Sequence, residues 1–237
     1  MQYLLTNDHS IEFVVTEDIT KDFGLHTHTS HYIVSYITQG GADLYYNNVN
    51  LALHQGDTFI IRPYMPHSVK VEKGAQIISL CINKNILSTE TAESLCNIIK
   101  TKYTEANLNN AALPSFLEAI TLIYNNLDNY LPSEIQAIAD KIASMSTSPC
   151  SLDQLSEEVF VSKYHLIRKF KASTGLTPHQ FLIQVRVRNA QKEIANGNRL
   201  IDAALDNGFY DSSHFDKYFE KIVGISPSEY SKKSRGI

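Results

Sequence analysis

An internal repeat constrains this 237-residue chain more than any other feature of its sequence. At an offset of 49 residues, the segment 162–181 aligns with the segment 211–230 without a gap, and the match extends upstream to Leu152 and Ile201. The matched pairs include His165 with His214, Phe170 with Phe219, Gly175 with Gly224 and Pro178 with Pro227. A duplication of this kind indicates two copies of one supersecondary unit.

Each copy predicts a short helix, a turn and a longer helix. Ser162 and Asp211 are residue types that cap helix N-termini, and each opens the longer helix of its copy. Gly175 and Gly224 suit the left-handed conformation in which helices end. Short helical segments precede the caps, so each copy has the layout of a helix-turn-helix motif.

A single helix over 178–196 is expected between the copies. Such a helix would hold two recognition helices about 34 Å apart, which is one turn of DNA. A bundle of repeated helix pairs that binds no DNA would have the same apolar spacing, and this alternative stays open at this stage.

The segment 134–232 resembles the DNA-binding domain of the AraC/XylS family of bacterial transcription regulators. The resemblance rests on Ser162–Leu166, Arg168, Phe170-Lys171, Gly175, Pro178, Phe181-Leu182, Arg186, Ala190, Ala203, Gly208-Phe209, Asp211–Phe215, Phe219, Gly224, Pro227 and Tyr230. It implies two helix-turn-helix motifs that read bases with their second helices. The residues that would face the groove are Lys163, Tyr164, Ile167, Arg168, Ser212, Ser213, His214 and Lys217.

Side-chain chemistry suggests a role for several of these residues. Arg168 can pair bidentately with guanine, and Lys217 suits guanine or phosphate. Ile167 suits contact with a thymine methyl group. For His165 and His214 the alternative is packing against the turn of their own motif.

The charge of the chain is distributed unevenly. The formal net charge is −4. Residues 1–150 carry 8 Lys/Arg against 15 Asp/Glu, or −7, whereas residues 151–237 carry 13 against 10, or +3. The positive part coincides with the duplicated unit and favours double-stranded DNA as its partner.

The segment 11–82 predicts short β-strands separated by turn signals such as Asn47-Asn48, which indicates a sandwich or barrel. Helical spacing replaces this pattern after residue 83. The expected fold has two domains, a cupin-like β-barrel (jelly roll) with following helices and an all-α domain with two helix-turn-helix motifs. The expected ranges are 1–85 for a sensor barrel, 86–131 for a helical linker and dimerisation region, and 132–237 for the DNA-binding domain.

Three histidines form a candidate metal site in the β segment. His26 and His28 are two residues apart, so they share a face if the strand includes both, and His67 follows a distant Gly-Asp and Pro-x-x-Pro pattern. This arrangement resembles the metal-binding motifs of cupins, although the carboxylate usual after the first two histidines is absent. Zinc or another divalent metal is one expectation, and a metal-free, degenerate cupin is the other.

Two further surfaces are expected. Five aromatic residues are candidates for the lining of an effector pocket: Tyr32, Tyr36, Tyr45, Phe59 and Tyr64. One helical stripe is the candidate for a homodimer interface, with core packing against the sheet as its alternative: Phe116, Ile120, Ile123 and Leu127.

The sequence argues against several classes of protein. No apolar run has the length of a membrane helix, and three scattered cysteines predict neither a disulfide framework nor a cysteine zinc site. A reduced, cytoplasmic setting follows. The leading hypothesis is a regulator that responds to a small-molecule effector and is not an enzyme. The rival hypothesis is a metal-binding cupin that acts mainly as a metal sensor or enzyme.

Overall fold

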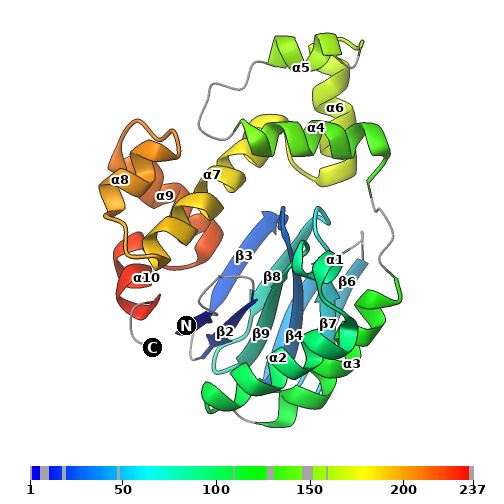
Figure 1. Ribbon diagram of the computed structural model, residues 1–237, viewed down its shortest axis with the longest axis vertical. Helices are drawn as coiled ribbons and strands as arrows, with labels where there is room; N and C mark the ends of the chain where they lie inside the picture. Colours follow the sequence, from blue (N-terminus) through cyan, green and yellow to red (C-terminus); the bar gives the residue numbers. More distant parts are fainter. Residues whose placement is uncertain are drawn as a thin grey trace. The chain divides into compact units, whose positions relative to one another are not determined.

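The structure is a computed structural model that describes residues 2–5, 11–17, 20–46, 49–108, 110–126, 131–145, 152–158 and 160–234. Within these residues the strands come first and the helices follow (Figure 1). The chain divides into two compact units, with the main division after residue 128. Helices α1–α3 and nearly all of the strand residues form the first unit, and α4–α10 form the second, with which the segment Leu25–Thr29 also groups. The predicted two-domain fold, β followed by all-α, is confirmed.

The strands of the first unit form two sheets. The strands are β1 (Gln2–Leu5), β2 (Ile11–Thr16), β3 (Lys21–His26), β4 (His31–Gln39), β5 (Gly41–Tyr46), β6 (Val49–His54), β7 (Thr58–Ile61), β8 (His67–Val71) and β9 (Gln76–Asn83). A five-stranded sheet has the order β1-β2-β9-β4-β7, and a four-stranded sheet has the order β3-β8-β5-β6. The turn predicted at Asn47-Asn48 lies outside the described residues, but the flanking strands β5 and β6 pair antiparallel as a hairpin requires.

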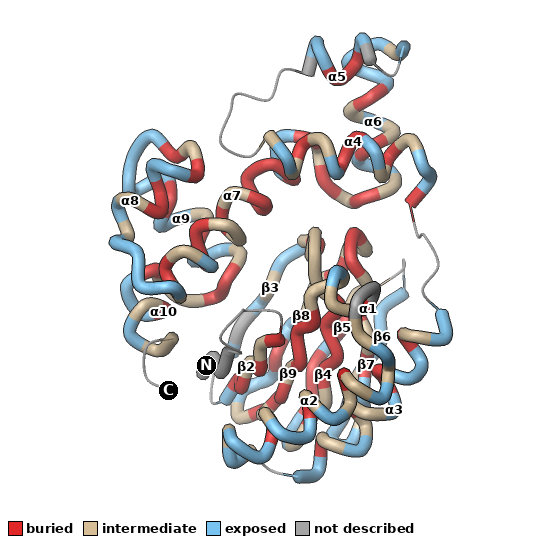
Figure 2. Tube along the Cα trace, in the orientation of Figure 1, coloured by how far each residue is buried: buried red, intermediate tan, exposed pale blue. Residues whose placement is uncertain are grey.

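The register of the strands assigns each side chain to one face of its sheet. Ile33 and Ile61 are direct partners on β4 and β7, and both belong to a buried cluster that includes Leu44 of the other sheet. Since cross-strand partners share a face, this cluster fills the space between the sheets. The central strands β4 and β9 are mostly buried (Figure 2).

The helices after the strands cover the outer face of the five-stranded sheet (Figure 1). They are α1 (Ile86–Thr89), α2 (Ala92–Glu105), the 3-10 helix η1 (Asn110–Ala112) and α3 (Leu113–Tyr124). Phe13 of β2 stacks edge-on against Tyr103 of α2 with ring centroids 5.6 Å apart, and it lies 6.5 Å from Phe116 of α3. Burial raises the pKa of Tyr103 to about 12 because the phenolate would lose its hydration.

This packing corrects two expectations. The segment 86–131 is not a separate linker, because α1–α3 group with the strands in one unit. The dimer stripe is not a free surface either, because Phe116, Ile120 and Ile123 are each at most 4% exposed within their own unit. Leu127 lies outside the described residues. An apolar stripe on a helix indicates that this side of the helix is buried, and here the five-stranded sheet covers it.

The second unit is helical throughout. Its helices are α4 (Ser133–Ser144), α5 (Leu152–Glu158), α6 (Lys163–Thr174), α7 (Pro178–Ala195), α8 (Leu200–Asp206), α9 (Ser212–Val223) and α10 (Pro227–Ser234). The Ser162 hydroxyl accepts from the His165 amide at 3.3 Å, and the Asp211 carboxylate accepts from the His214 amide at 2.7 Å. Both predicted caps of the longer helices are therefore confirmed.

The two helix-turn-helix motifs are α5–α6 and α8–α9. The longer helices and their terminal glycines repeat at 49 residues, with positive φ at Gly175 and Gly224. The shorter helices repeat at 48 residues instead, since Leu152–Glu158 corresponds to Leu200–Asp206. The gapless alignment is wrong in this upstream part.

The extra residue of the second motif lies in its turn. Phe160 and Gly208 both have positive φ, and their amides make equivalent bonds, to the carbonyls of Glu157 and Leu205 respectively. The cap follows Phe160 by two residues and Gly208 by three. The two turns therefore differ in length by one residue after the same left-handed position.

This correspondence predicts opposite effects for two substitutions. Phe160 is 95% exposed at φ +53°, so Phe160→Gly should stabilise the second unit by about 0.5–1 kcal/mol. Gly208→Ala should destabilise it by about 1–2 kcal/mol, because φ is +75° and the new Cβ would lie 2.9 Å from the Arg186 guanidinium carbon.

Urea denaturation followed by helical circular dichroism measures both effects. Gly197→Ala is the matched control for Gly208→Ala, since Gly197 also has positive φ but nothing lies within 4 Å of an added Cβ. Equal losses for the two glycines would remove the role assigned to Arg186. A loss of stability in Phe160→Gly would mean that its exposed ring contributes more than its backbone costs.

Candidate DNA-binding site

The recognition helices α6 and α9 are amphipathic in the same way. Leu166 and Phe170 of α6 are buried, as are Phe215 and Phe219 of α9 at the corresponding positions. The predicted DNA-contacting residues lie on the other faces. Seven of them are exposed, namely Lys163, Tyr164, Arg168, Ser212, Ser213, His214 and Lys217, while Ile167 is half-buried.

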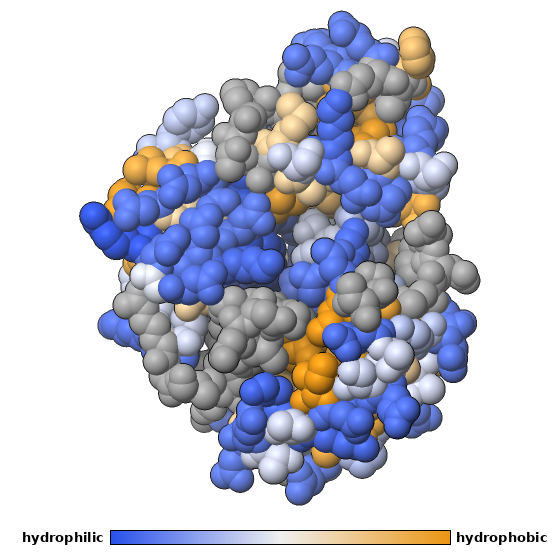
Figure 3. Space-filling model, in the orientation of Figure 1, coloured by the Kyte–Doolittle hydropathy of each residue, from blue (hydrophilic) through white to orange (hydrophobic). Residues whose placement is uncertain are grey.

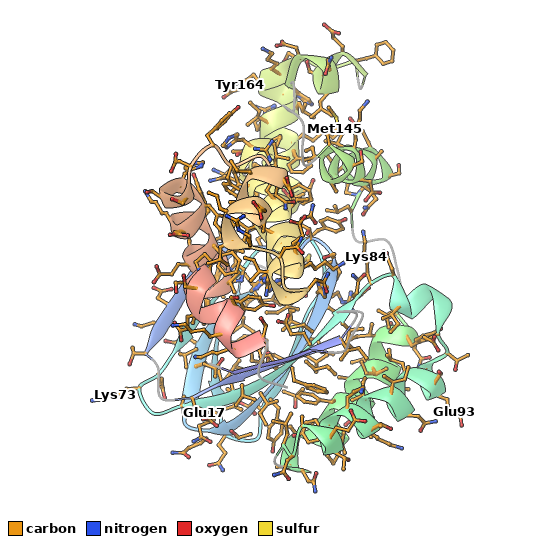
Figure 4. All side chains as sticks on the ribbon, turned by 60° about the vertical axis from the view of Figure 1, so that its left-hand side comes forward. Glu17, Lys73, Lys84, Glu93, Met145 and Tyr164 are labelled. Atoms are coloured by element: carbon orange, nitrogen blue, oxygen red, sulfur yellow. The ribbon has the colours of Figure 1, made fainter. Side chains whose placement is uncertain are left out.

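The first motif presents basic and aromatic groups. The Arg168 side chain is exposed and makes no hydrogen bond or ion pair within the described part of the chain. Tyr164 is 76% exposed and projects from α6 (Figure 4). Lys163 pairs with Asp153 of α5 at 2.5 Å, and Lys169 pairs with Glu134 of α4. The ion pair between Lys169 and Glu134 holds α6 against α4. The exposed Arg168 side chain stays available for contact with DNA.

Polar contacts from α7 hold the second motif. The Arg186 guanidinium donates to the Gly208 carbonyl at 2.9 Å. Asn207 is 2% exposed, and its amide donates to the Glu193 carboxylate and to the Ala203 carbonyl, both at 2.9 Å. These bonds fix the end of α8 against α7, so that α9 begins at a defined place. The visible surface of α7–α10 is largely hydrophilic (Figure 3).

The repeated histidines differ in their surroundings. The ring of His214 packs edge-on against Tyr218 at 4.8 Å and against Phe209 at 5.9 Å. The alternative of packing against its own motif therefore applies to His214, although the residue is still exposed. His165 is exposed on α6.

Three residues on the outward faces were not among the sequence candidates. Lys171, Asp216 and Glu220 are all exposed. The sequence held a signal for them, because Lys171 and Glu220 are repeat partners and Asp216 directly precedes the candidate Lys217. A comparison of charge at each pair of repeat positions would have found them.

The three candidate metal-binding histidines do not belong to one compact unit, since His67 lies in the first unit and the segment Leu25–Thr29, with His26 and His28, groups with the second. His26 ends β3 and His67 begins β8, which neighbours β3 in the four-stranded sheet. The metal site on His26, His28 and His67 stays a prediction from the sequence.

The tautomer of His67 is set by its surroundings. His67 is 1% exposed, and its Nδ1 lies 2.9 Å from the Met65 carbonyl. Since a carbonyl can only accept, Nδ1 carries the proton and a neutral ring has its lone pair at Nε2. A backbone partner of this kind commonly orients a metal-ligating histidine. A neutral imidazole held in this way fits zinc as one nitrogen ligand.

The five aromatic pocket candidates do not line one cavity. Tyr32 and Tyr36 alternate with Ile33 and Ser35 on β4, and Ser35 is the direct partner of Phe59. Phe59 therefore faces the space between the sheets, whereas the two tyrosines face the helices. Tyr32 is buried there, and Tyr36 contributes to the raised pKa of Tyr103.

The remaining two candidates lie elsewhere. Tyr45 follows the interior residue Leu44 on β5, so it faces away from the other sheet. Tyr64 lies between β7 and β8 with φ +66°, and its hydroxyl accepts from the Lys84 ammonium at 2.8 Å. The predicted aromatic pocket is thus wrong as a single site.

Two capped helix pairs, each with an exposed polar recognition helix, define a double helix-turn-helix protein with a β unit before it. Comparisons with known proteins agree with this class. Residues 155–233 match the family described as "Helix-turn-helix domain", and residues 9–124 match "AraC-like ligand binding domain". The chain belongs to the AraC family of transcriptional regulators and combines a ligand-binding domain with a DNA-binding domain.

Individual relatives show how far the similarity extends. The chain is 26% identical over 236 residues to the uncharacterized HTH-type transcriptional regulator YbfI of Bacillus subtilis, covering 86% of this chain and 85% of that protein. It is 33% identical over 108 residues to the HTH-type transcriptional activator RhaR of Escherichia coli, covering 44% of this chain and 38% of RhaR.

A solved structure shares the fold over nearly the whole chain. ToxT of Vibrio cholerae aligns with a TM-score of 0.65 at 17% identity, covering 96% of this chain and 98% of ToxT. At this identity the likeness concerns the fold alone. Among the described residues, no helix combines the length and the apolar character needed to cross a membrane.

Proposed function

We propose that α6 and α9 bind double-stranded DNA sequence-specifically by entering successive segments of the major groove. Arg168 carries the proposal, because it is an exposed cation without a partner in the described chain, on a helix fixed at both ends. A guanidinium in this position suits bidentate pairing with guanine. Lys217 occupies the equivalent position on α9.

Selection of bound sequences from random duplexes tests this function directly. The expected product is two short conserved segments about 10 base pairs apart, one for each recognition helix. Binding should weaken as salt rises, since each neutralised phosphate releases counterions. Recovery of no preferred sequence would overturn the proposal.

We further propose that the chain acts as a homodimer and responds to an effector in its β unit, without catalytic activity. The net charge of residues 151–237 is +3, which gives limited attraction to DNA. A second copy would raise the effective concentration of binding units on a palindromic site. Sedimentation of the full chain measures the oligomeric state. The buried residues Phe116, Ile120 and Ile123 of α3 are not part of the proposed dimer surface.

The histidine cluster favours a metal ion as the effector, and this makes metal sensing a second candidate function. Three neutral imidazoles are borderline donors that would suit zinc. The protein would contribute orientation, through the Met65 carbonyl on His67, and a partly dry surrounding. An effector acts only if it binds two states of the protein with different affinities.

The full chain should bind one zinc ion, and His67→Ala should weaken that binding. The loss should reach at least the roughly 10- to 100-fold that removal of an outer-shell partner causes, because a ligand itself is lost. Calorimetry with zinc alone measures it. His54→Ala is the control, since the His54 side chain is 79% exposed on β6 and outside the cluster.

The metal proposal has a clear contrary outcome. Protein that stays metal-free in excess zinc, while its DNA binding is intact, would remove metal sensing and leave the DNA-binding function standing. Metal lost equally in His54→Ala and His67→Ala would point to a different site. The double variant His26→Ala/His28→Ala checks the other two ligands.

A further inference from the structure

Corresponding positions of the two recognition helices carry different charges. The helices share N-caps, left-handed glycines and buried phenylalanines, so residues 49 apart occupy equivalent places. Helix α6 contains four basic and no acidic residues, whereas α9 contains two of each. The outward pairs are Lys163 with Ser212, Ile167 with Asp216, Arg168 with Lys217, and Lys171 with Glu220. The same scaffold therefore presents two different surfaces to DNA.

Arg168 and Lys171 of α6 suit attraction to phosphates, whereas Lys163 and Lys169 are already paired with Asp153 and Glu134. Each lysine or arginine that neutralises a phosphate adds affinity that is independent of sequence. Asp216 and Glu220 on α9 act in the opposite direction, because phosphates repel carboxylates. Neither acidic side chain has an ion pair within the described part of the chain. Bulk attraction should therefore come mainly from the first motif.

A carboxylate that faces DNA is favourable only where a base offers a donor. In the major groove, the N4 amino group of cytosine is the donor that Asp and Glu recognise. The ammonium of the adjacent Lys217 suits guanine O6 and N7, which are the acceptors of the same base pair. Asp216 and Lys217 are both exposed near the middle of α9. Together they match the donor and acceptor pattern of one C·G pair.

We propose that Asp216, with Lys217, makes α9 selective for a C·G pair, while α6 supplies most of the attraction to phosphates. The inference rests on the proposed DNA-binding function and assigns unequal parts to the two motifs. The first motif determines mainly how tightly the protein binds. The second determines where it binds, since its carboxylate is unfavourable at any position that lacks a donor.

Selection from random duplexes, with the full-length chain and with Asp216→Asn, tests this assignment. The native protein should select C·G at one position of the segment bound by α9. Asn pairs bidentately with adenine, so Asp216→Asn should change that one position to A·T and leave the other positions as they were. Affinity for the original site should fall roughly tenfold, while affinity for random duplex should rise.

Asp206→Asn is the matched control, because it removes the same charge from an exposed position on α8 of the same motif. It should raise binding to random duplex without changing any selected base. An unchanged preference in Asp216→Asn would overturn the assignment while the DNA-binding function stands. If the native protein selects no sequence, the proposed function and this inference fail together.

Discussion

Replacing Arg168 with alanine is expected to weaken binding to the selected DNA site by about 5- to 150-fold, the equivalent of one bidentate guanine contact. Binding to random duplex should fall much less, because there Arg168 contributes a single charge. The expectation rests on an exposed guanidinium that has no partner within the described part of the chain. Titration of both duplexes at one fixed salt concentration measures the two losses.

Arg168→Lys separates charge from geometry. It keeps the positive charge but loses the planar fork that grips guanine O6 and N7 together. Random-duplex binding should stay near the native value, whereas discrimination between sites should fall. Lys192→Ala removes a charge from an exposed position on α7, outside both recognition helices, and should leave discrimination unchanged. Equal losses of Arg168→Ala on both duplexes would leave Arg168 as a phosphate contact.

The sequence predicted the DNA-binding unit well because its signals are local. A cap, a left-handed glycine and an apolar spacing each depend on a few neighbouring residues, and at Ser162, Asp211, Gly175 and Gly224 all of them hold. The one-residue difference between the turns was missed. The small and apolar residues of α8 fit a repeat offset of 48 or of 49 residues. The backbone hydrogen bonds of Phe160 and Gly208 show that the offset is 48 for the shorter helices. Ser133 is a residue type that caps helices, but α4 begins at Ser133 itself and Pro132 precedes it.

The β unit was harder to predict because its surfaces depend on distant partners. Alternation along a strand places Tyr36 and Phe59 on definite faces, but which face meets the helices follows from the order of strands in the sheet. The stripe of α3 was visible as apolar, yet its spacing does not say whether a sheet or a second chain covers it.

The largest effect on stability should come from Phe219→Ala. Phe219 is fully buried, and its ring lies 5.3 Å from Phe215 and 5.7 Å from Tyr230 of α10. Removing a buried aromatic ring typically costs about 3–5 kcal/mol. This is a large share of the roughly 5–15 kcal/mol that stabilises a domain, so the second motif should open frequently.

Hydrogen exchange of the full chain resolves where this opening occurs. Amides of α8, α9 and α10 should lose protection in Phe219→Ala, while strands β4 and β9 keep theirs, because the two compact units have separate cores. Leu205→Ala is the control, since Leu205 is 53% exposed on α8 and its loss should cost less than about 0.5 kcal/mol. Equal loss of protection in β4 and β9 would mean that the units unfold together. Protection unchanged in α9 would show that its outward face, and not its buried aromatic rings, determines the helix.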